Sequence, residues 1–227
     1  MRLHTKGREP AKLRAYRAVP GATYDGANFT PVKDEIREAL LRDQEWLCCY
    51  CMRRISAEAR PNPANPEAQN VVQMKVEHWR SQSHNSEQAL AWTNMLGACT
   101  GGVGAAPSDQ TCDTRKGEDT ITLNPCEASH IATLRCSTRG RLESSNPQFQ
   151  KDIDERLGLN HRVLVDERRA MIKRALTRLN SAYATQGYPT TAVRDAVVGA
   201  ETTVGARAPE LCGTLRLWAR GRFGGSW

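Results

Sequence analysis

Four cysteines, arranged as two separated pairs, constrain the fold of this chain more than any other feature. Cys48 and Cys51 are separated by two residues, and the second pair, Cys99 and Cys112, follows later in the chain. Two such pairs supply four thiolates to a tetrahedral structural zinc ion, which then fastens a loop-rich segment into one rigid unit. We therefore expect zinc bound by Cys48, Cys51, Cys99 and Cys112, with Cys49 as the main alternative to Cys48.

The other cysteines have simpler interpretations. A redox dithiol has the same Cys-x2-Cys spacing as the first pair, but it has no need of the second pair. One alternative zinc set combines Cys126, His130 and Cys136. We expect instead that Cys126, Cys136 and Cys212 are small buried hydrophobic residues, as free cysteine commonly is.

The segment bracketed by the cysteine pairs carries the residue types that phosphodiester hydrolysis needs. Hydrolysis needs a base that takes a proton from water, and a histidine such as His78 suits this role because a free imidazole has a pKa of about 6.5. It also needs a cation at the scissile phosphate, and Mg²⁺ or Mn²⁺ binds carboxylate oxygens, here those of Glu77 and Asp113. Asn94 is suited to hydrogen-bond the loop facing the imidazole, and Lys116 to contact the phosphate. This set predicts a metal-dependent nuclease.

Each of these residues also has a structural interpretation. His78 is then a buried, hydrogen-bonded histidine, Asn94 a turn residue and Lys116 a surface charge. A regular strand points the side chains of Glu77 and His78 to opposite faces, so gathering both at one ion requires a bend there.

Charge is compatible with a nucleic-acid partner. The 227 residues carry a net charge of +7, and the pI is about 9.1. Most of the excess, +5, lies in residues 1–17, which form either a solvated basic arm or an arm that contacts phosphate or a partner. The sequence has no run of about 18 apolar residues and no apolar core of a signal peptide near its start. We therefore expect a cytoplasmic protein with reduced cysteines and no membrane partner.

The residue pattern predicts an α+β protein in three parts. Residues 1–47 form the basic arm and a helix, residues 48–145 a cysteine-braced core, and residues 146–227 a helical part suited to docking a partner. Strand, loop, strand and helix are expected to follow one another in the core and to surround one metal ion. Helices are expected from Thr30-Pro31 to the first cysteines, near Cys112, after Asn160, over Pro189–Val198 and over Pro209–Arg220. Strands are expected over Val71–Trp79, Ile121–Leu123 and Ile131–Cys136, with a turn at Thr138–Gly140.

The helix after Asn160 has an apolar stripe and several basic residues beside it. The basic residues form a solvated face or a surface for nucleic acid. The stripe consists of Leu164, Met171, Ile172, Ala175, Leu176 and Leu179. The basic residues are Arg168, Arg169, Lys173, Arg174 and Arg178.

Four motifs resemble those of HNH endonucleases of the ββα-metal class that carry a cysteine-knuckle zinc. They read Cys-Cys-Tyr-Cys-x-Arg-Arg-Ile (48–55), Val-Glu-His-Trp-x-x-x-Ser (76–83), Trp-x-Asn-Met-Leu-x-x-Cys (92–99) and Cys-Asp-x-x-Lys-Gly (112–117). More narrowly, the chain resembles the PtuB-like HNH subunits of Septu-type antiphage defence systems, which also occur with retrons. The resemblance covers most of residues 1–180.

By this resemblance residues 48–145 are the HNH nuclease core, His78 is the base, and Glu77 and Asp113 bind the catalytic Mg²⁺ or Mn²⁺. Asn94 is the middle residue of the HNH triplet. The resemblance also implies a PtuA-like ATPase partner, since the chain itself has no Walker-type motif. Two departures from the common pattern are Asp113 in place of His or Asn, and Glu77 in place of Asp. A glycine-rich insertion also lengthens the interval between Cys99 and Cys112.

Two other functions fit parts of the pattern. A non-catalytic zinc-knuckle module that binds nucleic acid or a partner needs the cysteines and the basic arm, but not Glu77, His78 and Asp113 together. A methyl-DNA restriction nuclease shares the core but needs a separate base-reading domain. The residue pattern does not distinguish DNA from tRNA as the substrate.

Overall fold

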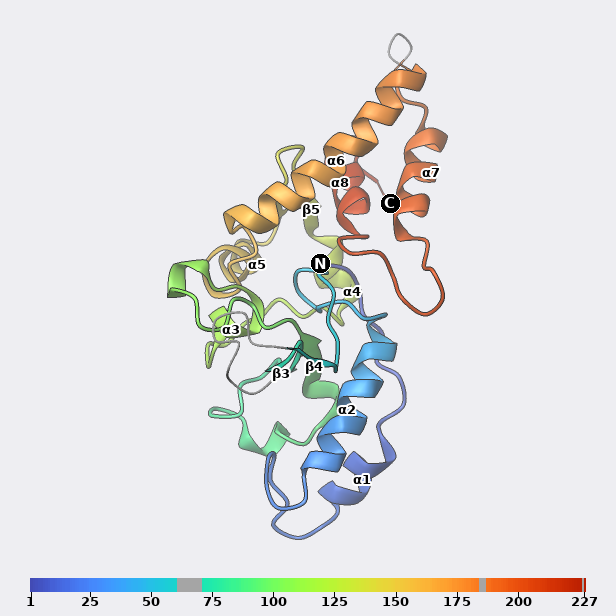
Figure 1. Cartoon of the computed structure of the whole chain (residues 1–227). Coiled ribbons are helices and arrows are strands. Elements are labelled where there is room, and N and C mark those ends of the chain that lie inside the picture. The colour runs from blue at the N-terminus through green and yellow to red at the C-terminus, as the bar shows by residue number, and fades with distance from the viewer. Residues whose placement is uncertain (61–70, 184–186, 226) are drawn as a thin grey trace.

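The computed structural model describes residues 1–60, 71–183, 187–225 and 227. Within this part the chain is mixed α+β, as expected, with eight α-helices and three two-stranded antiparallel sheets (Figure 1). The α-helices are α1 (Ala11–Arg17), α2 (Thr30–Asp43), α3 (Cys112–Lys116), α4 (Ala128–Ala132), α5 (Pro147–Lys151), α6 (Arg162–Tyr183), α7 (Thr190–Glu201) and α8 (Thr214–Phe223). The strands are β1 (Ala59–Arg60), β2 (Val71–Val72), β3 (Lys75–His78), β4 (Met95–Ala98), β5 (Leu134–Cys136) and β6 (Leu142–Ser144).

The β3–β4 sheet lies near the middle of the molecule, between the N-terminal and C-terminal helices (Figure 1). Its strands are antiparallel, with Lys75 opposite Ala98 and His78 opposite Met95. The single strand expected over Val71–Trp79 is interrupted and forms β2 and β3 instead. The short helix α3 follows β4 in the chain, so strand, strand and helix occur in the expected order.

Helix α2 is fastened to this sheet by one buried amide. It begins at Thr30, where proline at the next position loses no needed hydrogen bond. Gln44, directly after the helix, donates through Nε2 to the carbonyl of Gly97 at 2.8 Å. Its Oε1 accepts from the Gly97 amide at 2.7 Å. Both backbone groups of this residue in β4 are therefore satisfied by one side chain that is itself buried.

Residues 1–17 pack on the core and do not extend as an arm. Leu13 is fully buried. The ammonium of Lys6 lies 3.3 Å from the centroid of the Trp92 ring and donates to the Met95 carbonyl at 2.7 Å. Burial lowers the pKa of Lys6 to about 8. Arg2 is partly buried and forms an ion pair with Glu45 at 2.8 Å. The remaining basic side chains of this segment are exposed, namely Arg8, Lys12, Arg14 and Arg17.

The expected strand over Ile121–Leu123 is absent. One oxygen of the buried Asp152 carboxylate instead accepts the amides of Thr122 at 2.7 Å and Leu123 at 2.9 Å. A side chain thus replaces the neighbouring strand that these backbone groups would otherwise need. Of the strand expected over Ile131–Cys136, only the second half forms. Ile131 lies in α4, and the strand β5 begins at Leu134.

The C-terminal helices pack on one another and on β5. Helix α8 contacts β5, α6 and α7, so the last helix lies against the strand that precedes the helical part (Figure 1). In the expected stripe of α6, Leu164, Ile172, Ala175 and Leu179 are buried. Asn160 does not cap α6; it bonds both backbone groups of Leu142. Among the described residues no helix is long and apolar enough to cross a membrane.

Candidate metal centre and active site

The four cysteines named from their spacing come together in the structure. Cys48, Cys51, Cys99 and Cys112 are buried, and their sulfur atoms all lie within 4.8 Å of one another. The Sγ atoms of Cys51 and Cys99 are 3.7 Å apart. A tetrahedral zinc ion with Zn–S bonds of about 2.3 Å holds its sulfurs about 3.8 Å apart, whereas a disulfide brings them to about 2.05 Å. The cluster therefore fits a tetrahedral zinc ion and not a disulfide.

The structure distinguishes Cys48 from Cys49. Cys48 belongs to the cluster, while Cys49 lies outside it and donates its amide to the Gly97 carbonyl at 3.0 Å. Burial opposes ionisation of Cys48, but hydrogen bonds from Cys112 and the other neighbouring thiols hold its pKa well below the ordinary value. Burial raises the pKa of Cys49 well above its ordinary value. Because its sulfur lies in the cluster, Cys48 and not Cys49 is the candidate metal ligand.

The glycine-rich insertion loops away from the cluster and leaves its geometry intact. The amide of Thr111 donates to the carbonyl of Gly101 at 2.9 Å, which closes the neck of the insertion between Cys99 and Cys112. Gly101 has a φ of +55°, and a Cβ at this position would lie 2.1 Å from the Thr111 carbonyl oxygen. Only glycine allows this closure without moving the backbone. In the described part of the chain, the alternative set with His130 does not form a cluster of metal ligands.

The carboxyl groups of Glu77 and Asp113 form a hydrogen bond, and Asp113 directly follows Cys112 of the cluster in the chain. Burial and the contact with Asp113 raise the pKa of Glu77 well above its ordinary value. Burial acts to raise the pKa of Asp113 too, but the hydrogen bond from Glu77 and the charge of Lys75 outweigh it and lower the pKa. Lys75 forms an ion pair with Asp113 at 2.9 Å. Glu77 therefore holds the proton that the two carboxyl groups share.

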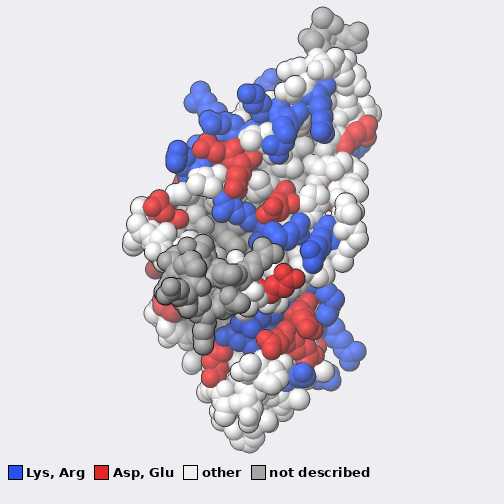
Figure 2. Space-filling model, in the orientation of Figure 1, with Lys and Arg blue, Asp and Glu red and all other residues white. Residues whose placement is uncertain are grey.

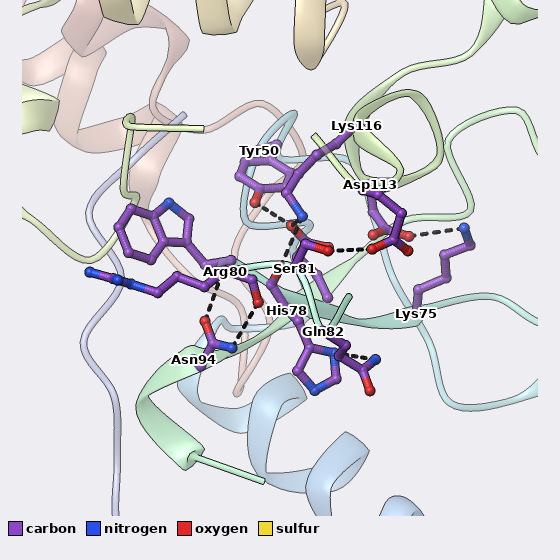
Figure 3. A network of polar contacts seen from close by, with 12 residues as sticks. Tyr50, Lys75, His78, Arg80, Ser81, Gln82, Asn94, Asp113 and Lys116 are labelled. Carbon is purple, nitrogen blue, oxygen red and sulfur yellow. Dashed lines mark hydrogen bonds and ion pairs between the residues drawn. The ribbon is translucent and has the colours of Figure 1, made fainter. Parts of the chain in front are cut away.

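Two donors converge on one oxygen of Glu77. The hydroxyl of Tyr50 donates to Oε1 at 2.7 Å, and the ammonium of Lys116 lies 2.9 Å from the same atom (Figure 3). Lys116 is buried and also donates to the His78 carbonyl at 2.9 Å. The structure thus places its ammonium inside the protein, so the alternative interpretation of Lys116 as a surface charge is wrong, while its contact with phosphate stays a prediction.

His78 is buried and held at both ring nitrogens. Nε2 lies 2.8 Å from the Ala89 carbonyl, which can only accept, so Nε2 carries the hydrogen. Nδ1 accepts from the Gln82 amide at 3.1 Å. The ring of Tyr24 packs edge-on against the imidazole, with centroids 4.5 Å apart. Burial is the main cause that lowers the pKa of His78, so the ring is neutral with Nδ1 as its basic nitrogen.

Asn94 bonds the backbone of the loop that carries the partner of His78. Its Oδ1 accepts the Arg80 amide at 2.7 Å, and its Nδ2 donates to the carbonyls of Arg80 at 3.0 Å and Gln88 at 3.2 Å. Gln88 directly precedes Ala89, whose carbonyl binds the imidazole. Asn94 therefore controls the position of His78 through the loop without touching the ring.

The base and the carboxyl pair lie on opposite sides of β3. Figure 3 shows the ring of His78 on one side of the strand and the carboxylate of Asp113 on the other. The ladder with β4 continues through His78, so the strand has no bend between Glu77 and His78. The two groups remain near enough for the charge of Asp113 to influence the pKa of His78.

Three residues that the sequence reasoning did not single out belong to this arrangement. Tyr50 and Lys75 contact the carboxyl pair, and Gln82 contacts the imidazole. For Tyr50, the position between two cysteines of the first motif is the one sequence feature that could have indicated a role in the site. Nothing in the pattern around Lys75 or Gln82 separates them from ordinary surface residues.

No protein-family model matches this chain, and a search of curated proteins finds no chain with significant similarity. The residues of the two sites are therefore the basis for inferring what the protein does.

Proposed function

We propose that this protein is a metal-dependent HNH endonuclease that hydrolyses phosphodiester bonds in nucleic acid. The observation that carries the proposal is the buried Glu77–Asp113 carboxyl pair on one side of β3 together with a neutral, oriented His78 on the other. In this proposal β3, β4 and α3 are the ββα-metal core, and the cysteine cluster binds a structural zinc ion. The four motifs that resemble this family support the same assignment.

Glu77 and Asp113 would hold one Mg²⁺ or Mn²⁺ ion, which replaces the shared proton. Bound there, the ion offsets negative charge that develops on the scissile phosphate and the leaving oxygen. Two carboxylates suit a hard cation that also keeps several water ligands. Lys75 neutralises Asp113 in the free protein and, as a partly exposed side chain, is able to move away when the cation binds.

His78 takes the proton of the attacking water at Nδ1, because its Nε2 is committed to the Ala89 carbonyl. In the free protein Nδ1 accepts a hydrogen bond from the Gln82 side chain. Because this side chain is exposed, it is able to move away when substrate binds. An in-line displacement places the attacking and leaving oxygens on opposite sides of the phosphorus. In this proposal the phosphate binds at the end of β3. The base then faces the attacking water from one side of the strand, and the carboxyl pair faces the leaving oxygen from the other.

We further propose that the protein is the effector subunit of an antiphage defence complex with a PtuA-like ATPase. The family resemblance supports this partner. Helix α6 carries five exposed basic side chains that are suited to contact nucleic acid, namely Arg162, Arg169, Lys173, Arg174 and Arg178. Figure 2 shows many basic side chains over the upper part of the molecule, where α6 lies.

The test is cleavage of plasmid DNA and of total tRNA, side by side, with Mg²⁺ or Mn²⁺. Each reaction compares wild type with His78→Ala, alone and with a co-purified ATPase subunit. The matched control is His84→Ala, because His84 is exposed and lies in the loop that follows β3. We expect cleavage by wild type and by the control, and its loss in His78→Ala with zinc retained. If neither substrate is cut under any condition while the fold and zinc are intact, the protein is a non-catalytic zinc-knuckle module.

A further inference from the structure

Tyr50 lies in the cysteine knuckle and reaches the carboxyl pair. It stands between Cys49 and Cys51 in the chain, its side chain is fully buried, and its hydroxyl donates to Oε1 of Glu77 at 2.7 Å. Cys51 belongs to the clustered sulfurs. One side chain therefore connects the cysteine cluster to the acid on β3.

The other carboxylate is connected to the cluster by the chain itself. Asp113 follows Cys112 directly, in the first turn of α3. The amide of Cys112 donates to the Leu157 carbonyl at 2.8 Å, so this turn is fixed from outside the cluster as well. Both halves of the carboxyl pair are therefore anchored next to sulfur ligands, one through a peptide bond and one through Tyr50.

The hydrogen bonds to Glu77 also determine which of its two carboxylate oxygens remains available to a cation. Tyr50 and Lys116 both contact Oε1, which leaves Oε2 without either of these two donors. Lys116 carries a positive charge that repels a bound dication, whereas the Tyr50 hydroxyl is neutral. Tyr50 is thus the donor that orients Glu77 without opposing the cation.

We propose that Tyr50 is a positioning residue that presents Oε2 of Glu77 to a divalent cation, using the rigid cysteine knuckle as its support. This inference rests on the proposed function, because it takes the carboxyl pair as the cation site. It adds a residue that determines cation affinity and that touches neither the cation nor the substrate.

The experiment measures Mn²⁺ affinity by the electron paramagnetic resonance signal of free Mn²⁺, with zinc already loaded. The proteins are wild type, Tyr50→Phe and the control Tyr16→Phe, which loses a hydroxyl bonded to the Thr23 carbonyl outside the site. We expect Tyr50→Phe to weaken Mn²⁺ binding about 10- to 100-fold, as loss of such supporting partners does elsewhere. The control should bind Mn²⁺ like wild type, and all three should keep the same zinc content and melting temperature.

A double substitution separates positioning from a general structural effect. In a Glu77→Gln background, Tyr50→Phe should cause no further loss of Mn²⁺ affinity, because the carboxylate it orients is already gone. An equal loss in that background, unchanged affinity in Tyr50→Phe alone, or loss of zinc from Tyr50→Phe would each overturn the proposal. If wild type itself binds no Mn²⁺ beyond zinc, the cation site is wrong and the proposed function fails with it.

Discussion

The carboxyl groups of Glu77, on β3, and Asp113, on α3, share one proton in a buried site. Two ionised carboxylates at this separation repel each other, so the pair must hold either a proton or a cation. The nearby ammonium groups of Lys75 and Lys116 offset the negative charge that remains. In the proposed function a divalent cation would compete with the shared proton for this pair.

Loss of one clustered cysteine should release zinc and destabilise the fold. Cys112→Ser removes one of four ligands, and structural zinc commonly contributes folding free energy directly. We expect a zinc content near zero and a lower melting temperature, measured by elemental analysis and thermal denaturation. The matched control is Cys126→Ser, outside the cluster, which should keep its zinc. Zinc loss from the control would instead support the alternative set with His130.

The two lysines at the carboxyl pair should differ in their contribution to stability. Lys116 is buried and contacts both Oε1 of Glu77 and the His78 carbonyl, so Lys116→Met should lower the free energy of unfolding by about 3 kcal/mol. Lys75 has a side chain that is 36% exposed, so Lys75→Met should cost about 1 kcal/mol or less. Urea denaturation of both variants measures the difference. Equal effects would show that Lys116 does not act as a buried partner of Glu77.

Asn94→Ala should reduce both stability and cleavage. The substitution leaves the backbone groups of Arg80 and Gln88 without their partner inside the protein, which costs about 2–3 kcal/mol. It also frees the loop that holds the carbonyl bonded to His78, so cleavage should fall. Asn85→Ala, in the same loop, removes a single long bond of 3.3 Å to Ser81 and serves as control. Denaturation and cleavage assays on both variants test the role of the loop, and a normal cleavage rate in Asn94→Ala would contradict it.

His4 should make the protein less stable in mild acid. Its ring is 3% exposed, and neither nitrogen makes a hydrogen bond of good geometry within the described part of the chain. Burial lowers its pKa from 6.5 to about 3, so the unfolded chain binds a proton that the folded chain does not. Stability should therefore fall as the pH drops below about 6.5, by about 2 kcal/mol at pH 5.

His4→Leu should remove this part of the pH dependence, because leucine fills the space without titrating. Unfolding by urea at pH 7 and at pH 5, for both proteins, measures the difference. Comparison between the two proteins cancels the effect of acid on the zinc ligands. An identical pH dependence in the variant would show that His4 is not the responsible group.

The cysteine spacing predicted which four sulfurs cluster, because two separated cysteine pairs of this kind are typical of a zinc site. The choice between Cys48 and Cys49 needed the fold, since adjacent residues have almost the same spacing to the second pair. The backbone of Cys49 pairs with Gly97 in β4, and this contact determines which sulfur faces the cluster.

Local pattern was least informative where a distant side chain replaces regular structure. Residues 121–123 have the composition of a strand, yet the carboxylate of Asp152 satisfies their amides. Asparagine often caps a helix, yet the side chain of Asn160 forms hydrogen bonds with the backbone of Leu142 in β6. Both partners are distant in sequence, so periodicity and propensity carry no information about them.

The sequence alone determined the α+β class, the cysteine ligands apart from Cys48, the start of α2 and the strand that carries Glu77 and His78. These follow from local spacing and turn chemistry. Only the tertiary structure decided that Lys116 is buried, that Tyr50 supports Glu77, and that His78 lies across β3 from the carboxyl pair. Such relationships depend on which faces meet when elements far apart in the chain pack together, and that is a property of the whole fold.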